Sequence, residues 1–263
     1  RYGGRPTRGG LPLDIHDKEF VTLLGSSGCG KTTTLRLIAG FLEPTSGKVL
    51  LKGEDITGVP PYKRPVNTVF QKYALFPHLN VFENVAFGLR LKKMDEETIR
   101  RKVRDMLEVV GLKGFERRSI GQMSGGQQQR VAIARAFVSK PRVIFADEPT
   151  GNLDSITSKQ VLYRMLQISK QMGTTFVMVT HEPELASCAD RIITILDGKV
   201  QSDLVQDPAT RERNREALFA SLEGNMRIGG DSASGEVHQK TAAELASYAA
   251  PAAAVQQPEQ PKP

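Results

Sequence analysis

The sequence predicts an α/β fold built on a parallel sheet, with a helical block inserted into it. An apolar, β-branched run at residues 20–24 leads through a glycine-rich loop into a helical pattern. Two later apolar runs, at residues 142–146 and 175–180, flank a helical pattern at 158–171, which is the alternation typical of a parallel sheet. Between these two parts of the sheet, helical patterns dominate residues 81–140.

The glycine-rich loop is the most specific feature of the chain, because it matches the pattern G-x-x-x-x-G-K-[ST] in full. Glycines let backbone N–H groups converge on phosphates, and the helix that follows adds the positive end of its dipole. We expect Lys31 to reach the β- and γ-phosphates and the Thr32 hydroxyl to bind Mg²⁺. The sequence thus predicts a nucleoside triphosphate site formed by Gly25, Ser26, Ser27, Gly28, Cys29, Gly30, Lys31, Thr32 and Thr33.

The stretch between this loop and the helical block is expected to be mostly irregular. A short strand pattern at residues 48–51 follows a turn at 44–47. Four prolines punctuate residues 54–80, so this segment is predicted as loops around a short strand at 68–70. The chain opens with glycine- and arginine-rich residues and no methionine, and we expect a strand of the domain to precede its first residue.

The C-terminal part changes character after residue 202. A third apolar strand at residues 191–196 turns at Asp197 and Gly198, and a polar helix is predicted over 208–222. The end of the chain is rich in Ala, Pro and Gln and has no means of building a core. We therefore predict a folded domain over residues 1–202, then a C-terminal helix and a largely disordered tail within 203–263.

Composition excludes several classes of protein. No apolar run approaches the roughly 18 residues that span a bilayer, so any association with a membrane is expected to be peripheral. Two cysteines, Cys29 and Cys188, form no disulfide framework. The formal net charge of +7 suits an anionic membrane surface. Because the basic clusters are not interleaved with aromatic residues, no nucleic acid is expected as a partner.

A second candidate site follows the strand at residues 143–146, which ends at Asp147 and Glu148. An acid at the end of a strand beside a phosphate loop typically holds Mg²⁺, and the next carboxylate can orient and deprotonate the attacking water. A third candidate is the helix that begins with Ser124, Gly125, Gly126 and Gln127, which again offers bare N–H groups to an anion. One chain thus carries two helix N-termini suited to phosphate but one lysine of the phosphate-loop type.

Taken together, these motifs resemble the nucleotide-binding domain of the ABC transporter family. The resemblance runs from about residue 2 to residue 200 and rests on the phosphate loop, Gln71, the segment 124–128, Asp147, Glu148, residues 152–154 and His181. It implies a P-loop NTPase core with a parallel sheet, a small antiparallel β region and a helical subdomain at about 81–140. It also implies ATPase activity, with ATP and Mg²⁺ as cofactors.

The resemblance also implies a role for each motif. Gln71 would be the glutamine that senses Mg²⁺ and couples to the membrane partner, Glu148 the catalytic base, and His181 the histidine that contacts the γ-phosphate. Thr32, Gln71 and Asp147 would hold the metal. Tyr2 lies where the family places the aromatic residue that stacks on adenine. The ATP held by the opposite subunit would be contacted by Ser124, Gly125, Gly126, Gln127 and Asp154.

Two parts of the sequence resemble different kinds of ABC protein. Residues 18–93 closely resemble the ATPases of polyamine-type importers, whereas residues 147–155 are similar to lipoprotein-releasing, macrolide-exporting and cell-division ATPases. Import of a small solute is the first expectation, and extrusion and non-transporting signalling remain alternatives. The expected partners are a second ATPase subunit, identical or closely related, an integral membrane permease and, for an importer, a periplasmic substrate-binding protein. The expected location is the cytoplasmic face of the inner membrane.

Overall fold

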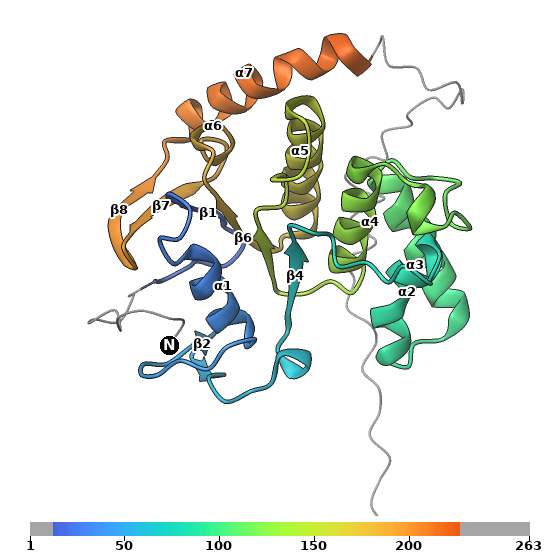
Figure 1. Cartoon of the computed structure of the whole chain (residues 1–263), viewed down its shortest axis with the longest axis horizontal. Helices are drawn as coiled ribbons and strands as arrows, with labels where there is room; N and C mark the ends of the chain where they lie inside the picture. Colours follow the sequence, from blue (N-terminus) through green and yellow to red (C-terminus); the bar gives the residue numbers. More distant parts are fainter. Residues whose placement is uncertain (1–12, 227–263) are drawn as a thin grey trace, which may run out of the picture.

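The computed structural model describes residues 13–226 and contains one six-stranded sheet in the order β4-β5-β6-β1-β7-β8 (Figure 1). Five strands run parallel to their neighbours, and β8 pairs antiparallel with β7. The predicted α/β fold with a parallel sheet is therefore confirmed. Tyr2 and the tail predicted to be disordered lie outside the described residues. The strands are β1 (Phe20–Leu24), β4 (Val66–Phe70), β5 (Val143–Asp147), β6 (Thr175–Thr180), β7 (Arg191–Leu196) and β8 (Lys199–Val205).

Side chains alternate along each strand, so the two faces of the sheet are covered by different helices. On β6, Val177 and Val179 face the helix α1 (Lys31–Ala39), whose Leu35 and Ala39 belong to the same apolar cluster. Phe176 lies on the opposite face, where its ring stacks on Phe137 of α4 (Gly125–Phe137) at a centroid distance of 6.0 Å. The helix α5 (Ser155–Met172) packs on this second face as well. Both faces of the parallel sheet are thus buried.

The helical block forms the side of the molecule beyond β4 (Figure 1). It consists of α2 (Val81–Leu91), α3 (Glu96–Val109), the 3₁₀ turn η2 (Ile120–Gln122) and α4. Asn80 caps α2 by accepting from the Glu83 N–H, and Asp95 caps α3 by accepting from the Thr98 N–H, each at 2.8 Å. The sequence predicted helices here, and these caps mark where two of them begin.

The region between α1 and β4 contains the small antiparallel β region that the resemblance implies, which is confirmed. Two short strands, β2 (Leu50–Leu51) and β3 (Glu54–Asp55), form a small antiparallel sheet, and η1 (Pro61–Lys63) is a 3₁₀ turn. The predicted strand at 48–51 is shorter than expected, because the Val49 N–H donates to the Thr57 hydroxyl instead of a strand carbonyl. β4 starts at Val66 rather than Thr68, since Val66 already pairs with Val143 of β5.

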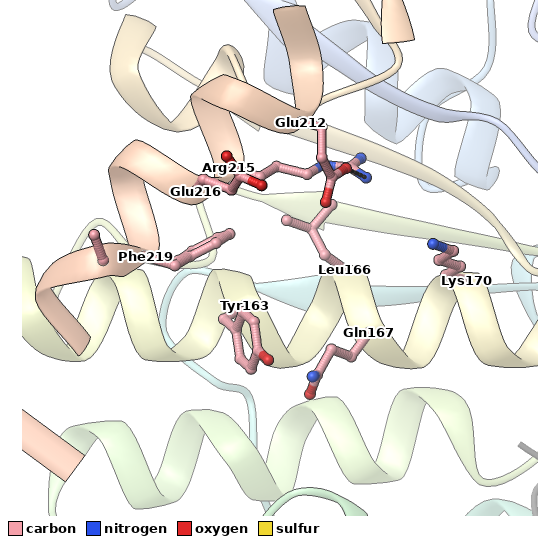
Figure 2. A pocket seen from close by; sticks show the side chains of 9 residues that line it. Tyr163, Leu166, Gln167, Lys170, Glu212, Arg215, Glu216 and Phe219 are labelled. Carbon is pink, nitrogen blue, oxygen red and sulfur yellow. Dashed lines mark ion pairs between the residues drawn. The ribbon is translucent and has the colours of Figure 1, made fainter. Parts of the chain in front are cut away.

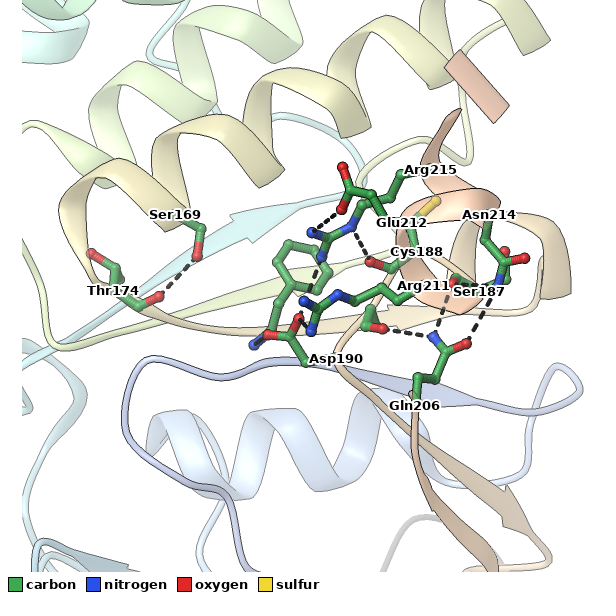
Figure 3. A network of polar contacts seen from close by, with 12 residues as sticks. Ser169, Thr174, Ser187, Cys188, Asp190, Gln206, Arg211, Glu212, Asn214 and Arg215 are labelled. Carbon is green, nitrogen blue, oxygen red and sulfur yellow. Dashed lines mark hydrogen bonds and ion pairs between the residues drawn. The ribbon is translucent and has the colours of Figure 1, made fainter. Parts of the chain in front are cut away.

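The last helix, α7 (Pro208–Met226), is fastened to the domain by the polar network of Figure 3. Asp190 accepts from Arg211 at 2.7 Å and from Arg215 at 3.4 Å, both on α7. The other oxygen of the Asp190 carboxylate accepts from the Phe20 N–H at 2.8 Å, at the start of β1. The side-chain amide of Gln206 also donates hydrogen bonds to the carbonyls of Ser187 and Ala189.

α7 also packs on α5 through buried Leu218, and the two helices flank a cavity of about 390 Å³ (Figure 2). The boundary predicted at residue 202 falls inside β8, a strand that the sequence prediction omitted. The short helix α6 (Pro183–Ala186) was not predicted either. Among the helices within residues 13–226, none is both long and apolar enough to cross a bilayer.

Candidate nucleotide-binding and hydrolysis site

The predicted phosphate-loop, metal-binding and catalytic residues meet at one edge of the sheet, because they lie at or just after the carboxyl ends of four parallel strands. Phe70 of β4 pairs with Asp147 of β5, which pairs with Val179 of β6. Gln71, Glu148 and His181 therefore emerge side by side, and the phosphate loop leaves β1 at the same edge. Ligands of open α/β sheets typically bind at this edge.

The phosphate loop has a backbone that requires its glycines. Gly28 and Gly30 have φ angles of 81° and 104°, in the left-handed region that side chains disfavour. A Cβ on Gly25 would lie 2.3 Å from the Ile195 carbonyl oxygen, so only glycine fits between the loop and β7. Ser26, Ser27, Gly28 and, in the first turn of α1, Thr33 are exposed. The loop thus presents its backbone to a ligand at the N-terminus of α1.

Lys31 is buried within this loop. Its ammonium group donates to the carbonyl oxygens of Gly25 and Ser26, at 2.7 Å each. Only 4% of the residue is exposed, and its charge is compensated by these carbonyl dipoles. The sequence predicted a lysine beside the phosphate position, and the structure adds that the lysine also tightens its own loop.

Cys29 contributes to the loop differently from its neighbours. Its side chain is buried in the apolar cluster that contains Leu35 and Ile195, whereas its carbonyl accepts from the Gly198 N–H at 2.9 Å. A residue in this position can offer a ligand its backbone but not its thiol. We therefore expect Cys29 to contact a nucleotide through its main chain, because its side chain fills the space between α1 and the sheet.

Two predicted metal ligands are in direct contact. The Thr32 hydroxyl donates to the Asp147 carboxylate at 2.7 Å, which places an alcohol and a carboxylate oxygen together at the start of α1. Oxygen donors of this kind suit Mg²⁺, which usually binds one or two protein oxygens together with phosphates and water. The residues present therefore fit a Mg²⁺–nucleotide complex.

Glu148 and His181 form a second pair, one step further along the same edge. The Nδ1 atom of His181 lies 3.4 Å from the Oε1 atom of Glu148. Glu148 has a φ of 46°, which costs a non-glycine residue about 1–2 kcal/mol, and its N–H is held by the Val179 carbonyl at 3.0 Å. Such strain at a carboxylate beside a phosphate loop makes Glu148 a candidate for a functional role.

Gln71 contacts the turn that begins at Glu148. The Asn152 amide donates to the Gln71 carbonyl at 3.0 Å. A Cβ on Gly151 would lie 2.8 Å from the Gln71 amide nitrogen, so the Gln71 side chain lies against this turn. The third predicted metal ligand is thus adjacent to the segment that carries Asp147 and Glu148.

The Ser124 segment forms a helix start as predicted. Ser124 caps α4 by accepting from the Gln127 N–H at 3.3 Å, and the Gln127 side chain accepts from the Ser124 N–H at 3.1 Å. Added Cβ atoms would meet the Tyr73 hydroxyl at 2.9 Å from Gly125, and Thr157 at 2.4 Å from Gly126. The contacts described for these glycines therefore run to Tyr73 in a loop and to Thr157 of α5, both in the same subunit. At the capped N-terminus Ser124 is exposed, whereas Gly126 is buried.

Asp154 caps the next helix. Its carboxylate accepts from the Thr157 N–H at 2.9 Å at the start of α5, and hydrogen bonding by Thr157 lowers the pKa of Asp154. Because Thr157 is also the residue under Gly126, the N-termini of α4 and α5 lie side by side. The structure thus brings the Ser124 and Asp154 segments together on one surface. The resemblance implies that both segments contact the ATP held by the opposite subunit.

Comparison with known proteins identifies the family. The sequence profile described as ABC transporter matches residues 9–151, more than half of the chain. The chain belongs to the ABC transporter family. It is 54% identical over 211 residues to the spermidine/putrescine import ATP-binding protein PotA of Rubrobacter xylanophilus, covering 80% of this chain and 55% of that protein. For PotA of Acetivibrio thermocellus the identity is 55% over 192 residues, with 73% and 54% covered. The chain thus spans about half the length of these curated relatives.

Two solved ABC structures share the fold. A dimeric structure of MJ0796, described as a bacterial ABC transporter cassette, matches with a TM-score of 0.67 and 35% identity over 74% of this chain and 88% of that one. CbiO1 of Clostridium perfringens, part of the transporter complex CbiONQ, matches with a TM-score of 0.69 and 27% identity, over 85% and 88%. The predicted P-loop core of the ABC type is confirmed.

Sequence reasoning missed the residues that hold the ABC motifs in place. Arg135 of α4 donates to the carbonyls of Tyr73 and Ala74, just after Gln71, and burial lowers the pKa of Arg135. Gln129 of α4 donates to the Pro149 carbonyl, just after Glu148. These side chains lie within an ordinary helical pattern, so no local signal distinguishes them.

Proposed function

We propose that this chain is the ATP-binding and ATP-hydrolysing subunit of an ABC transporter. The observation that carries the proposal is the contact between the Thr32 hydroxyl and Asp147 beside the buried Lys31, with Glu148 and His181 following at the same edge of the sheet. Binding of ATP is supported by the glycine-dependent backbone of the loop. Hydrolysis is supported by a strained carboxylate next to it.

Each residue takes a role in this proposal. The N–H groups of the loop and the Lys31 ammonium bind the phosphates, while Thr32, Asp147 and Gln71 hold Mg²⁺, which supplies charge neutralisation at the transferred phosphate. Glu148 accepts a proton from the attacking water, and its contact with His181 orients both side chains. Tyr2, outside the described residues, stays a prediction for adenine stacking.

The proposed active form is a dimer. Ser124 is exposed at the capped N-terminus of α4, and Asp154 is exposed beside it. Gly125 and Gln127 are half-buried in the single subunit, and Gly126 is buried. A head-to-tail pair would place this N-terminus on the nucleotide held by the partner's phosphate loop. The dimeric structure of the similar MJ0796 cassette supports such an arrangement.

Polyamine-type import is the transport reaction that we favour, because the relatives reported above are named as spermidine/putrescine import proteins. The proposal includes an integral membrane permease as partner, a periplasmic substrate-binding protein, and a location at the cytoplasmic face of the membrane. Extrusion or signalling is the second candidate, favoured by residues 147–155, which are similar to lipoprotein-releasing, macrolide-exporting and cell-division ATPases.

Hydrolysis is tested by Glu148→Gln in the purified chain. We expect the steady-state ATPase rate to fall about 10²- to 10⁴-fold, which is typical for loss of a general base, while ATP binding is retained. The measurements are phosphate release and equilibrium binding of a fluorescent ATP analogue. Turnover at the wild-type rate would remove Glu148 from its role.

Transport is tested by reconstituting the chain in proteoliposomes with the permease encoded beside its gene. We expect ATP-dependent uptake of radiolabelled spermidine that depends on a substrate-binding protein. ATP-dependent release of a lipoprotein or a macrolide instead, with no uptake of spermidine, would favour extrusion.

A further inference from the structure

Gln129 is a buried polar residue to which the proposed function assigns no part in binding or hydrolysing ATP. It lies on α4 with no exposed surface, one turn after Gly125 and Gly126, and so on the face of the helix that packs on α5 and the turn before it. Its amide nitrogen donates to the Pro149 carbonyl, across twenty residues of sequence. The other amide atom, Oε1, is buried and has no hydrogen-bond partner among the described residues.

A buried amide of this kind is costly to keep, because an unsatisfied acceptor loses its hydration and gains no protein partner. A leucine would fill a similar volume without that cost. The orientation of the amide is fixed by Pro149, whose carbonyl accepts only from the NH₂ group, so turning the amide would set two acceptors against each other. The bond to Pro149 is therefore the feature that distinguishes glutamine from an apolar residue here.

Pro149 follows Glu148 directly, in a turn that is held at several points. The Glu148 N–H is bound by Val179, and the Glu148 carbonyl accepts from the Gly151 N–H at 3.1 Å. Among the described residues, Gln129 makes the one hydrogen bond between this turn and a residue within α4. Because Glu148 adopts a left-handed φ, such external contacts are needed to keep its carboxylate in place.

We infer that Gln129 is a positioning residue that couples the catalytic Glu148 to α4, here called the signature helix because it begins with the Ser124, Gly125, Gly126 and Gln127 motif. The inference rests on the proposed function, in which Ser124 at the start of α4 serves the nucleotide of the partner while Glu148 serves its own. A helix displaced by the partner's nucleotide then shifts the turn of its own site through Gln129. Within each subunit, Gln129 thereby links the segment that binds the partner's nucleotide to the carboxylate that acts on the subunit's own nucleotide.

The test is Gln129→Leu in the full chain, with Gln129→Met as a second apolar variant of similar length. We expect kcat for ATP hydrolysis to fall about tenfold, because a small misplacement of a catalytic group is enough for such a loss, while KM stays within about twofold. Gln206→Leu is the matched control, since Gln206 is also a buried glutamine that donates to backbone carbonyls, but away from the site. It should keep the wild-type kcat.

A second measurement separates positioning from general damage. In single-turnover assays, Gln129→Leu should lower the rate about tenfold with Glu148 present and leave the residual rate of Glu148→Gln unchanged, because both changes act through one carboxylate. The variant carrying both changes should still dimerise with ATP, as we also expect of Glu148→Gln alone.

Equal losses in both backgrounds, or loss of ATP-dependent dimerisation, would overturn the inference and assign Gln129 to the support of the signature helix instead. An unchanged kcat in both apolar variants would overturn it as well. The proposed function fails in a different way, namely if the wild-type chain neither binds nor hydrolyses ATP.

Discussion

Lys31 shows how one residue serves both the loop and its ligand. Its ammonium is held by the Gly25 and Ser26 carbonyls, so it is already in position before a phosphate contact forms. A buried cation that exchanges dipolar partners for a phosphate gains a charge-assisted bond without ordering a flexible side chain. This preorganisation is a property of the single residue and its immediate loop.

We therefore expect Lys31→Ala to weaken ATP binding by about ten- to a hundredfold, as one charge-assisted hydrogen bond is worth about 1.5–3 kcal/mol. Equilibrium titration with a fluorescent ATP analogue measures the loss. Lys170→Ala, which removes a lysine on α5 that lines the cavity of Figure 2, is the control and should bind as wild type. Unchanged affinity in Lys31→Ala would contradict the assignment of the loop.

The two thiols should both be protected in the folded protein. Cys29 is buried between α1 and the sheet, and burial raises the pKa of Cys188 to about 11. At pH 8 we expect labelling by a disulfide reagent to be about a hundredfold slower than in urea, because the thiolate is the reactive form. The raised pKa of Cys188 stabilises the fold below about pH 9, and this contribution disappears as the pH rises through about 11.

Time courses of labelling between pH 7 and 11, in the wild type and in Cys188→Ser, measure this protection. From its place in the phosphate loop alone, Cys29 would be expected to be shielded from a reagent by bound ATP. In the structure the apolar core already covers this thiol. Rapid labelling of Cys29 in the folded protein, slowed by ATP, would show that the loop opens more readily than its packing indicates.

At the scale of elements, α7 is joined to β1 through one carboxylate. Asp190 accepts from Arg211 and Arg215 on α7 (Figure 3). It also accepts from the Phe20 N–H at the start of β1. Asp190→Ala would leave two guanidinium groups and a strand N–H without this acceptor. We expect the free energy of unfolding to fall by about 2 kcal/mol, measured by urea denaturation, since these partly buried groups lose charge-assisted bonds.

Glu212→Ala is the matched control for this prediction. Glu212 is mostly exposed and lies 3.9 Å from Arg215, so its removal should change the free energy of unfolding by less than about 0.5 kcal/mol. Equal losses in the two variants would show that α7 is held by its apolar contacts, such as Leu218, and not by Asp190.

At the scale of the whole molecule, the site is incomplete in one chain, because the second phosphate-type helix start faces outward. The Glu148→Gln variant should dimerise when ATP is added, as the nucleotide bridges two subunits that cannot hydrolyse it. Adding Ser124→Arg should suppress this dimerisation, since a large cation would block the capped N-terminus of α4. Gel filtration with and without ATP measures the outcome. Equal dimerisation of the two variants would mean that Ser124 does not act across an interface.

Local sequence signals predicted most of the site and much of the fold. The phosphate loop depends on glycines that recur within six residues, Asp147 and Glu148 end an apolar strand, and the Ser124 cap is a four-residue pattern. Each of these patterns can be recognised within a few consecutive residues. The order of strands and helices could be predicted for the same reason, since the burial of alternate residues marks a strand within a few positions.

Other features depended on contacts between distant segments. β8 is mostly exposed and becomes a strand through its pairing with β7, and Cys29 points into the core because α1 packs over it. The partner of Gln129 lies twenty residues away and offers only a main-chain carbonyl, which no side-chain pattern can announce. Near-neighbour chemistry thus specified where the reactive groups occur along the chain. The directions in which these side chains point were decided by the packing of α1 and α4 on the sheet, because a side chain can occupy only the space that the neighbouring elements leave free.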